Sequence, residues 1–276
     1  MANIIPMAGL GSRFSAEGYD VPKPLITVSG EPMIIQVIRR LPSSDKWIFL
    51  VRQEHIDRYQ LDEIIIKEIP EAIIVGTNCT TSGQATTCLL AQAYVEPEES
   101  ILIGACDAVC LIDEEKHRRL ITDQRNDCVV WTCTKFERMR QMPHLYGWVR
   151  LAEDCETVVG MSVKVPISAN PYQDHGVVAT FNFRRSSEFF EAVNLMIKKN
   201  YAVDGEYYVD TVPVVLSEMQ KRSIIFDVNK ILSWGTPREL KEYELWEERV
   251  RSMGYRPSND LENQQYLYWK EVFDAV

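Results

Sequence analysis

The sequence has little of what marks a membrane, nucleic-acid or zinc-binding protein. It contains no apolar run of membrane-spanning length. Its formal charge of −10 argues against a nucleic-acid partner, because binding a phosphate backbone needs a concentrated basic face. Its seven cysteines are scattered without a C-x₂-C pair, which argues against structural zinc and a disulfide framework. A strand is expected within the first residues, which leaves no room for a signal peptide, so we expect a reduced, cytoplasmic protein.

The apolar residues that are present suffice for one large α/β core, since 46% of the 276 residues are hydrophobic. Short apolar runs alternate with segments of helical spacing. This alternation predicts a mainly parallel central sheet with helices on both faces. Strands are expected at residues 2–7, 47–51, 72–75, 99–107, 128–134, 174–183 and 222–228, a hairpin at 146–151 and 157–164, and helices from about 32, 64, 82, 187 and 237 onward.

A turn with two glycines follows the first predicted strand. Gly9 and Gly11 flank Leu10, and such a turn lets backbone N–H groups approach an anion with no Cβ in the way. Arg13 and Lys23 add a guanidinium and an ammonium group nearby. The turn lacks the last glycine of a dinucleotide fingerprint and the Gly-Lys-Ser/Thr of a Walker loop. We interpret it as a polyphosphate site of another kind.

Three segments near the start carry a family resemblance. They are residues 9–14 (Gly-Leu-Gly-Ser-Arg-Phe), 22–25 (Pro-Lys-Pro-Leu) and 30–34 (Gly-Glu-Pro-Met-Ile). Together they resemble the opening of the sugar-phosphate nucleotidylyltransferases, also called nucleoside-diphosphate-sugar pyrophosphorylases. The resemblance implies a Rossmann-like, GT-A-type fold with a small β-hairpin acceptor lobe. It extends over roughly residues 1–240.

The resemblance also assigns roles around the first turn. Arg13 would hold the departing phosphates of a nucleoside triphosphate, and Lys23 would bridge the reacting phosphates. The nucleotide would contact Ala8, Gly9, Gly11 and Ser12.

A polar loop at residues 76–85 matches the family segment that reads the nucleotide base. Asn78 and, five residues on, Gly83 match its amide side chain and its glycine. The alternative is a simple helix cap made by the Ser and Thr side chains. An Asn in this loop suits a pyrimidine, and we place cytidine ahead of uridine and thymidine.

Asp107 ends the fourth predicted strand, and ligands of open α/β sheets bind at the carboxyl ends of strands. The resemblance assigns Asp107 to Mg²⁺, which prefers hard oxygen ligands. The family also has an Asp-x-Gly-Thr corner whose Asp completes the metal site, but Ser233 stands there. Asp107 then works with phosphates and water alone, Asp227 or Asp210 substitutes, or catalysis is impaired. We take Asp107 and Asp227 as the predicted metal ligands.

The acceptor half matches the family at several positions. Tyr146 and Gly147 match its Tyr-Gly pair, and Lys164 matches the lysine that holds the acceptor phosphate. Glu206 matches an acidic acceptor ligand, although a first-turn helix acid explains it equally well. Val163 replaces the usual Glu before the lysine, which leaves an ordinary hexose phosphate open to question.

The resemblance implies a nucleotidyltransferase domain at residues 1–236, with a nucleotide half at about 1–135 and an acceptor half at about 136–236. A helical extension rich in aromatic residues would follow at 237–276, and self-association through it stays open. The implied reaction joins a nucleoside monophosphate from an NTP to a sugar phosphate or another small phosphorylated metabolite. The opening segment also resembles capsule and surface-polysaccharide enzymes.

Two other functions remain open. A glycosyltransferase of the related fold would use a nucleotide sugar, but Asp107-Ala108-Val109 is no D-x-D metal motif. A non-catalytic sensor would bind a triphosphate and release no pyrophosphate.

Overall fold

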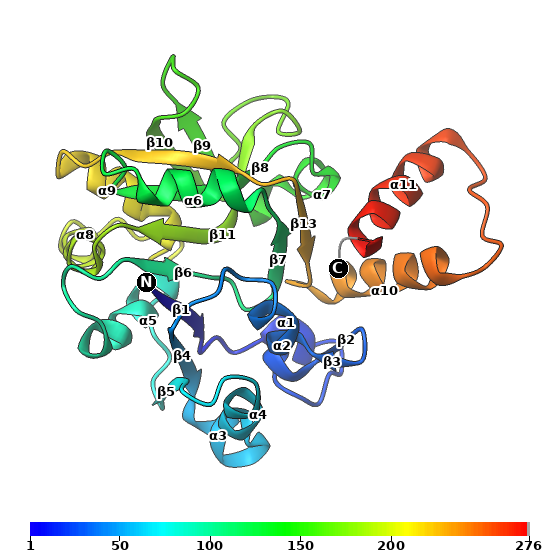
Figure 1. Cartoon of the computed structure of the whole chain (residues 1–276), viewed down its shortest axis with the longest axis horizontal. Helices are drawn as coiled ribbons and strands as arrows, with labels where there is room; N and C mark the ends of the chain where they lie inside the picture. The colour runs from blue at the N-terminus through cyan, green and yellow to red at the C-terminus, as the bar shows by residue number, and fades with distance from the viewer. Residues whose placement is uncertain (275–276) are drawn as a thin grey trace.

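A nine-stranded sheet forms the centre of the computed structural model, which describes residues 1–274 (Figure 1). The main path through the sheet is β10-β9-β11-β6-β1-β4-β5, and β8 joins β11 to β12. The strands are β1 (Ala2–Met7), β4 (Lys46–Arg52), β5 (Ile73–Thr77), β6 (Ile101–Ile103), β8 (Cys128–Cys133), β9 (Gly147–Leu151), β10 (Val158–Val163), β11 (His175–Phe183) and β12 (Ser223–Asp227).

Most strands of this sheet run in one direction. β1 pairs in parallel with β4 and β6, β4 with β5, and β8 with β12. Only β10 and β11 run against the others among the nine strands described. The predicted α/β class, with a mainly parallel central sheet and a hairpin made by β9 and β10, is confirmed.

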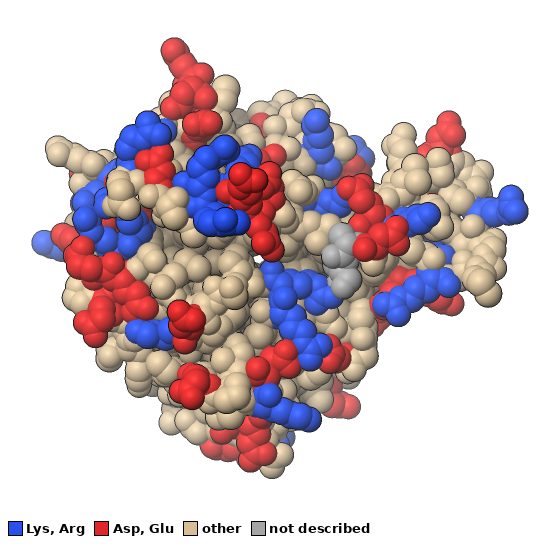
Figure 2. Space-filling view, viewed as in Figure 1, with Lys and Arg blue, Asp and Glu red and all other residues tan. Residues whose placement is uncertain are grey.

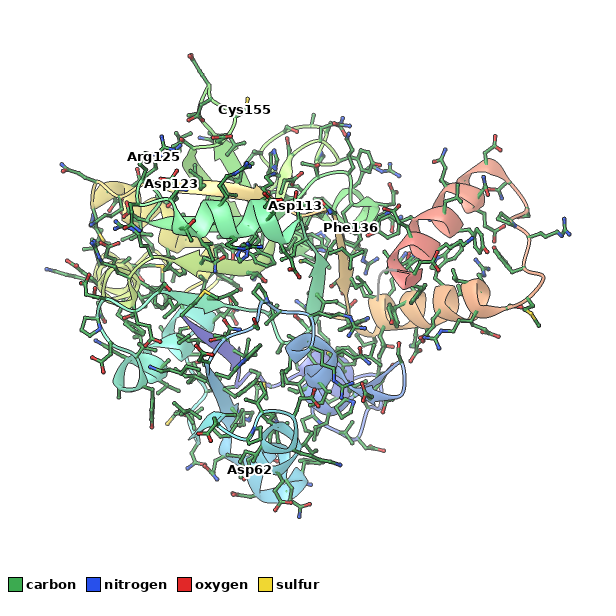
Figure 3. All side chains as sticks on the ribbon, viewed as in Figure 1. Asp62, Asp113, Asp123, Arg125, Phe136 and Cys155 are labelled. Atoms are coloured by element: carbon green, nitrogen blue, oxygen red, sulfur yellow. The ribbon has the colours of Figure 1, made fainter. Side chains whose placement is uncertain are left out.

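Helices cover both faces of the sheet and its ends (Figure 1). Asp113 caps the helix α6 by accepting a hydrogen bond from the backbone of Lys116, as a helix N-cap should. Figure 3 shows Asp113 and Asp123 at opposite ends of this helix. The helices are α1 (Ser12–Ser15), α2 (Met33–Ile38), α3 (Gln53–Tyr59), α4 (Leu61–Glu68), α5 (Gln84–Cys88), α6 (Glu114–Thr122), α7 (Glu137–Gln141), α8 (Ser186–Lys198), α9 (Val212–Glu218), α10 (Pro237–Arg251) and α11 (Asp260–Asp274), with 3₁₀ turns η1 (Lys23–Leu25), η2 (Leu89–Tyr94), η3 (Pro143–Leu145) and η4 (Val209–Thr211).

Strand β1 shows why the sequence folds this way. All six of its residues are buried, because side chains of a strand point alternately to the two faces and both faces are covered. Ile4 belongs to the core that packs against α8, whereas its neighbour Ile5 belongs to the core on the other side with α2. The strand therefore holds the loop after it in a fixed place.

The predicted fourth strand at 99–107 is too long. β6 ends at Ile103, and Gly104 makes the last contact with β1 by donating to the carbonyl of Ile4. The chain then leaves the sheet, and β7 (Ala108–Leu111) pairs with β13 (Lys230–Ser233), which the sequence did not predict. Asp107 lies directly before β7 and not at the end of a sheet strand. A second small pair, β2 (Thr27–Val28) with β3 (Glu31–Pro32), was also missed.

The last two helices pack on the core through aromatic side chains. Tyr243 of α10 and Trp269 of α11 are both buried, with ring centroids 5.9 Å apart in an edge-to-face arrangement. Trp234 lies against Tyr243 and links the pair of helices to the corner after β13. The predicted extension to residue 276 runs beyond the described residues at its last two positions.

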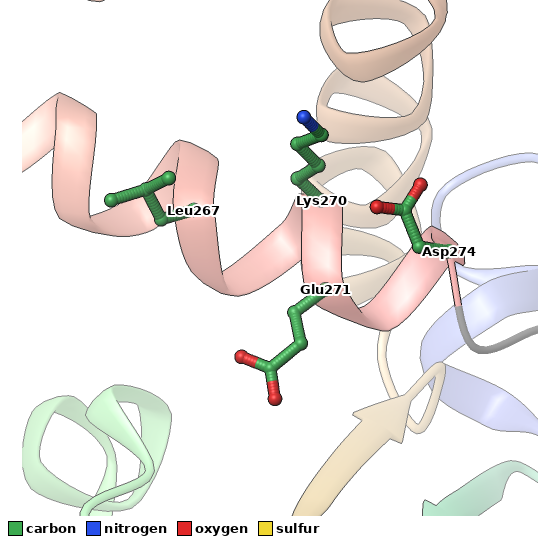
Figure 4. A pocket seen from close by; sticks show the side chains of 4 residues that line it. All are labelled: Leu267, Lys270, Glu271 and Asp274. Atoms are coloured by element: carbon green, nitrogen blue, oxygen red, sulfur yellow. The ribbon is translucent and has the colours of Figure 1, made fainter.

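The surface of the molecule carries charges of both signs. On the face in Figure 2, Lys and Arg side chains lie close to Asp and Glu side chains, with uncharged surface between these groups. Figure 4 shows a shallow pocket on α11 lined by Leu267, Lys270, Glu271 and Asp274. Among the helices of residues 1–274, none combines the length and the apolar character that crossing a membrane requires.

Candidate functional site

The loop after β1 presents free backbone donors. From residue 9 to residue 13, no backbone N–H group donates to another residue of the described chain. Gly11 has φ +63°, and a Cβ on it would lie 3.5 Å from the Cβ of Lys23, so the turn sits directly on the lysine stem. Consecutive free N–H groups in such a turn form a concavity that suits anionic oxygens.

Lys23 connects this loop to Asp107. Its ammonium group is ion-paired with Asp107 Oδ2 and donates to the carbonyl of Gly235 at 3.2 Å. Burial is the largest single influence and lowers the pKa of Lys23, but the charge and hydrogen bond of Asp107, together with the nearby Cys106 and Glu239, give a net upward shift. The lysine is therefore charged and held in place at neutral pH.

Asp107 faces a second carboxylate across Gly235. A Cβ on Gly235 would lie 3.3 Å from Asp107 Oδ2 and 3.3 Å from Glu239 Oε2. The backbone N–H of Trp234 donates to the carbonyl of Asp107 at 2.8 Å, which fixes this corner against the start of β7. The missing side chain at position 235 thus leaves a space between two acidic groups.

Glu239 is buried in the first turn of α10, with an exposed fraction of 7%. Its Oε1 accepts hydrogen bonds from Ser233 at 3.1 Å and from the hydroxyl of Tyr146 at 3.3 Å. Its Oε2 accepts one from Thr236 at 2.8 Å. Arg138 Nε lies 3.9 Å from Oε1, too far for a hydrogen bond. Burial and the nearby Glu239 charge raise the pKa of Tyr146, so its hydroxyl stays a donor.

Asp227 lies at the end of β12 in different surroundings. It accepts hydrogen bonds from Thr132 at 3.2 Å and Thr134 at 3.3 Å, and His175 Nδ1 lies 3.3 Å away. In the described part of the chain, no hydrogen bond or ion pair joins it to Asp107. The structure therefore does not bring the two predicted metal ligands into contact.

Other predicted nucleotide contacts are spread around the loop. Ala8 is buried, whereas Gly9, Ser12 and Arg13 are exposed. Within residues 1–274, the guanidinium of Arg13 has no hydrogen-bonding partner, so it is free to meet a ligand.

Asn78 and Gly83 lie in different surroundings in the loop at residues 76–85. Asn78 is exposed. Gly83 has φ +114°, and a Cβ on it would lie 2.6 Å from the backbone nitrogen and oxygen of Tyr207. Close packing against Tyr207 is a structural reason for this glycine that the sequence did not reveal.

The predicted acceptor residues fall into two groups. Tyr146 and Gly147 lie beside the acidic corner, by which we mean Asp107, Gly235 and Glu239. Gly147 lets Asp210 approach closely, since a Cβ there would lie 2.0 Å from Asp210 Oδ2. Lys164 lies after β10, with Nζ 3.4 Å from Asp204 and 4.9 Å from the ring centre of Tyr208.

The hydroxyl of Tyr208 donates to Glu206, so one tyrosine connects Lys164 to Glu206. The pKa of Lys164 is raised, mainly by the Tyr208 hydroxyl.

Comparison with known proteins identifies the family. Residues 3–170 match the MobA-like NTP transferase domain. The chain belongs to this family. As a member of the MobA-like NTP transferases it is a nucleotidyltransferase, and the predicted relationship to the nucleotidylyltransferases is confirmed. No match was found among curated protein sequences.

Solved structures of similar fold agree with this family. A nucleoside-diphosphate-sugar pyrophosphorylase from Vibrio cholerae RC9 has a TM-score of 0.70 at 19% identity, covering 87% of this chain and 98% of its own. The inositol-1-phosphate CTP transferase from T. maritima has a TM-score of 0.67 at 16% identity, covering 88% and 94%. A UDP-glucose pyrophosphorylase from Acinetobacter baumannii has 0.66 at 14% identity, covering 97% and 98%. The predicted GT-A-type nucleotidyltransferase fold is therefore confirmed.

Two buried charged residues beside the candidate site, Arg138 and Glu239, were not predicted from the sequence. A signal for Glu239 was present, because Thr236-Pro237-Arg238-Glu239 is a capping-box pattern that places the glutamate at a helix start, directly after the Gly-Thr corner. For Arg138 no local pattern existed, since α7 and α10, which carry Arg138 and Glu239, are far apart in the sequence.

Proposed function

We propose that this NTP transferase moves a nucleoside monophosphate from an NTP to a small phosphorylated acceptor and releases pyrophosphate. The observation that carries the proposal is the Lys23–Asp107 pair beside a loop of free N–H groups. This arrangement offers donors and a fixed cation for phosphate oxygens, with a carboxylate suited to a metal ion.

The residues would act by positioning and by neutralising charge, which carry the rate in phosphoryl-type transfers. The loop from Ala8 to Ser12 would bind the triphosphate and the exposed Arg13 would hold its departing end. Lys23 would bridge the reacting phosphates from its place on Asp107. The acceptor oxygen would attack the α-phosphorus, and the bond from that phosphorus to the bridging oxygen of pyrophosphate would break.

Divalent metal fits the acidic corner. Asp107 and its surroundings provide hard oxygen atoms, and Gly235 leaves space beside them. Mg²⁺ bound here would offset the charge of the phosphates. A cation at this corner would complete its ligands with substrate oxygens and water, because no group of three or more His, Cys, Asp or Glu side chains in residues 1–274 is arranged to hold a metal.

For the acceptor, we infer a sugar phosphate or a similar phosphorylated metabolite. Lys164 would bind its phosphate, while Tyr146, Gly147 and Glu206 would contact the remainder. Similar structures include a nucleoside-diphosphate-sugar pyrophosphorylase and an inositol-1-phosphate CTP transferase, which supports this class.

For the nucleotide, we propose a pyrimidine triphosphate read by Asn78, with CTP ahead of UTP and dTTP. We further propose that the product serves capsule or surface-polysaccharide synthesis in the cytoplasm, where NTPs are supplied.

The proposed division places the nucleotide half at 1–135, the acceptor half at 136–236 and the helical extension after Thr236. The first half contains the loop after β1, Lys23 and Asp107, and the second half contains Tyr146 and Lys164.

A pyrophosphate-release screen tests the proposal. CTP, UTP, dTTP and GTP, each with Mg²⁺, are combined with phosphorylated sugars, alditols and amino alcohols. We expect release with one triphosphate and one acceptor class. Binding of a triphosphate with no release from any pair would favour a sensor instead, and stabilisation by UDP-sugars but by no triphosphate would favour a glycosyltransferase.

A further inference from the structure

We propose that Glu239 replaces the aspartate missing at position 233 and binds a divalent cation together with Asp107. The inference deepens the proposed function and rests on it for the presence of a metal. It assigns the second acidic ligand to α10, and not to Asp227 on β12.

The first support is the position of the two carboxylates. Both reach within 3.3 Å of the single point where a Cβ on Gly235 would stand. Oε2 of Glu239 accepts one hydrogen bond, from Thr236, and a carboxylate oxygen has capacity for another partner. Asp107 Oδ1 accepts no hydrogen bond from any residue in the described chain. Glu239 Oε2 thus keeps capacity for a cation at this point. Asp107 holds the Lys23 ammonium with Oδ2 and would offer Oδ1 to the cation.

The second support is a buried cation beside the pair. Arg138 has an exposed fraction of 6%, yet its Nε and Nη1 have no hydrogen-bond partner in the described chain. Buried guanidinium groups are normally paired, because leaving their donors unpaired is costly. Its nearest acid is Glu239, whose Oε1 lies 3.9 Å from Nε, so at least this open donor faces the Glu239 carboxylate. A phosphate oxygen bound to the same cation as Glu239 would satisfy them.

Ser233, which stands where the family has an aspartate, is compatible with a ligand six positions later at Glu239. Its hydroxyl donates to Glu239 Oε1 at 3.1 Å and thereby orients the longer glutamate toward Gly235. An aspartate at 233 would instead place a second negative charge against Glu239, which is unfavourable in a buried setting. Positions 233 and 239 therefore act as alternatives that supply one carboxylate between them.

Helix capping is the competing explanation of Glu239. The Thr236 hydroxyl accepts from the backbone N–H of Glu239 at 3.2 Å, as an N-cap does, and donates to the Glu239 side chain at 2.8 Å. Glutamine serves equally well at this position of a capping box, but it lacks the charge that a metal ligand needs. The variant Glu239→Gln therefore separates the two roles.

The test measures Mn²⁺ binding directly. The full-length protein is titrated with Mn²⁺, and free Mn²⁺ is followed by electron paramagnetic resonance, with and without a non-hydrolysable triphosphate analogue. We expect Glu239→Gln to weaken binding by at least about tenfold and to leave the protein folded, with a lower metal-free melting temperature because buried Arg138 loses its nearest acid. Glu248→Gln removes the same charge from an exposed position of the same helix and should bind as the unmodified protein does.

A rescue completes the test. The double variant Ser233→Asp with Glu239→Gln restores one carboxylate and should regain most of the Mn²⁺ affinity. The inference is overturned if the unmodified protein binds no Mn²⁺, if Glu239→Gln binds normally, or if the double variant stays as weak as Glu239→Gln. Mn²⁺ binding through Glu239 without pyrophosphate release from any substrate pair would sustain the inference and overturn the proposed function.

Discussion

Lys23 and Asp107 are ion-paired although 84 positions separate them in the sequence. Lys23 lies in η1, against Gly11 of the turn after β1, and Asp107 lies directly before β7. The ion pair therefore connects this turn to the start of β7. Their side chains are 17% and 25% exposed, so the contact is partly buried and open to a ligand on one side. The expected turnover and stability of the site both depend on this Lys23–Asp107 ion pair.

Replacing Lys23 by alanine should lower turnover by at least about 100-fold, because a preorganised positive charge would be lost where negative charge develops. The fold should remain, with a modest drop in melting temperature from leaving Asp107 unpaired. Pyrophosphate release and thermal melting measure the two effects. Lys241→Ala breaks a surface pair with Glu17 and should change neither; full turnover of Lys23→Ala would refute the assignment.

Gly235→Ala should reduce metal-dependent activity by about tenfold or more with little effect on stability. The new methyl group would stand 3.3 Å from each carboxylate, in the space that a cation needs. Flexible side-chain ends can shift to accept it, so the melting temperature should move by only a few degrees. Raising Mg²⁺ should recover part of the activity. Unchanged activity at low Mg²⁺ would show that the space has no role.

Asp210 should make stability depend on pH. Burial raises its pKa to about 6, so the folded protein keeps a proton that the unfolded chain loses near pH 4. The stability from this group is full below about pH 4 and is lost as pH rises through about 6. Asp210→Asn should therefore melt several degrees higher than the unmodified protein at pH 8, gaining about 1–3 kcal/mol, with little difference at pH 4. The exposed Asp45→Asn is the control, and equal pH profiles for all three proteins would contradict the expectation.

Gly83→Ala should destabilise the fold by about 3 kcal/mol or more, because its Cβ would meet the Tyr207 backbone at 2.6 Å in a left-handed conformation. Gly9→Ala is the matched substitution, since nothing lies within 4 Å of a Cβ there. Its melting temperature should equal that of the unmodified protein. Urea unfolding measures both, and a stable Gly83→Ala protein with weaker nucleotide binding would point to base reading alone.

The sequence predicted the sheet well because buried parallel strands have a strong local signature. Residues 2–7 and 128–134 are nearly continuous apolar runs, and β1 and β8 were found within a residue of their ends. The four-residue strands β7 and β13 were missed, because each depends on a partner more than a hundred positions away. Local patterns carry no information about such pairing.

The site was partly predictable for the same reason. Gly11 and Lys23 stand in recognisable local segments, and the structure places them side by side. The proposed role of Glu239 was not predicted because an acid in the first turn of a helix and a metal ligand look identical in sequence. Only the approach of α10 to Asp107 distinguishes them, and that approach depends on Trp234 and Tyr243 packing together.

The location of Glu239 changes how the last helices should be regarded. Helix α10, which carries Glu239, is held in place by Tyr243 and Trp246. These two side chains belong to the same core cluster as residues of α2, β1, β4 and α11. A truncated chain ending at the Gly-Thr corner would keep every strand of the sheet and would lose Glu239, the acidic group that we propose as a metal ligand. Attempts to trim this protein, or to graft its first 236 residues onto another tail, should therefore carry α10 along.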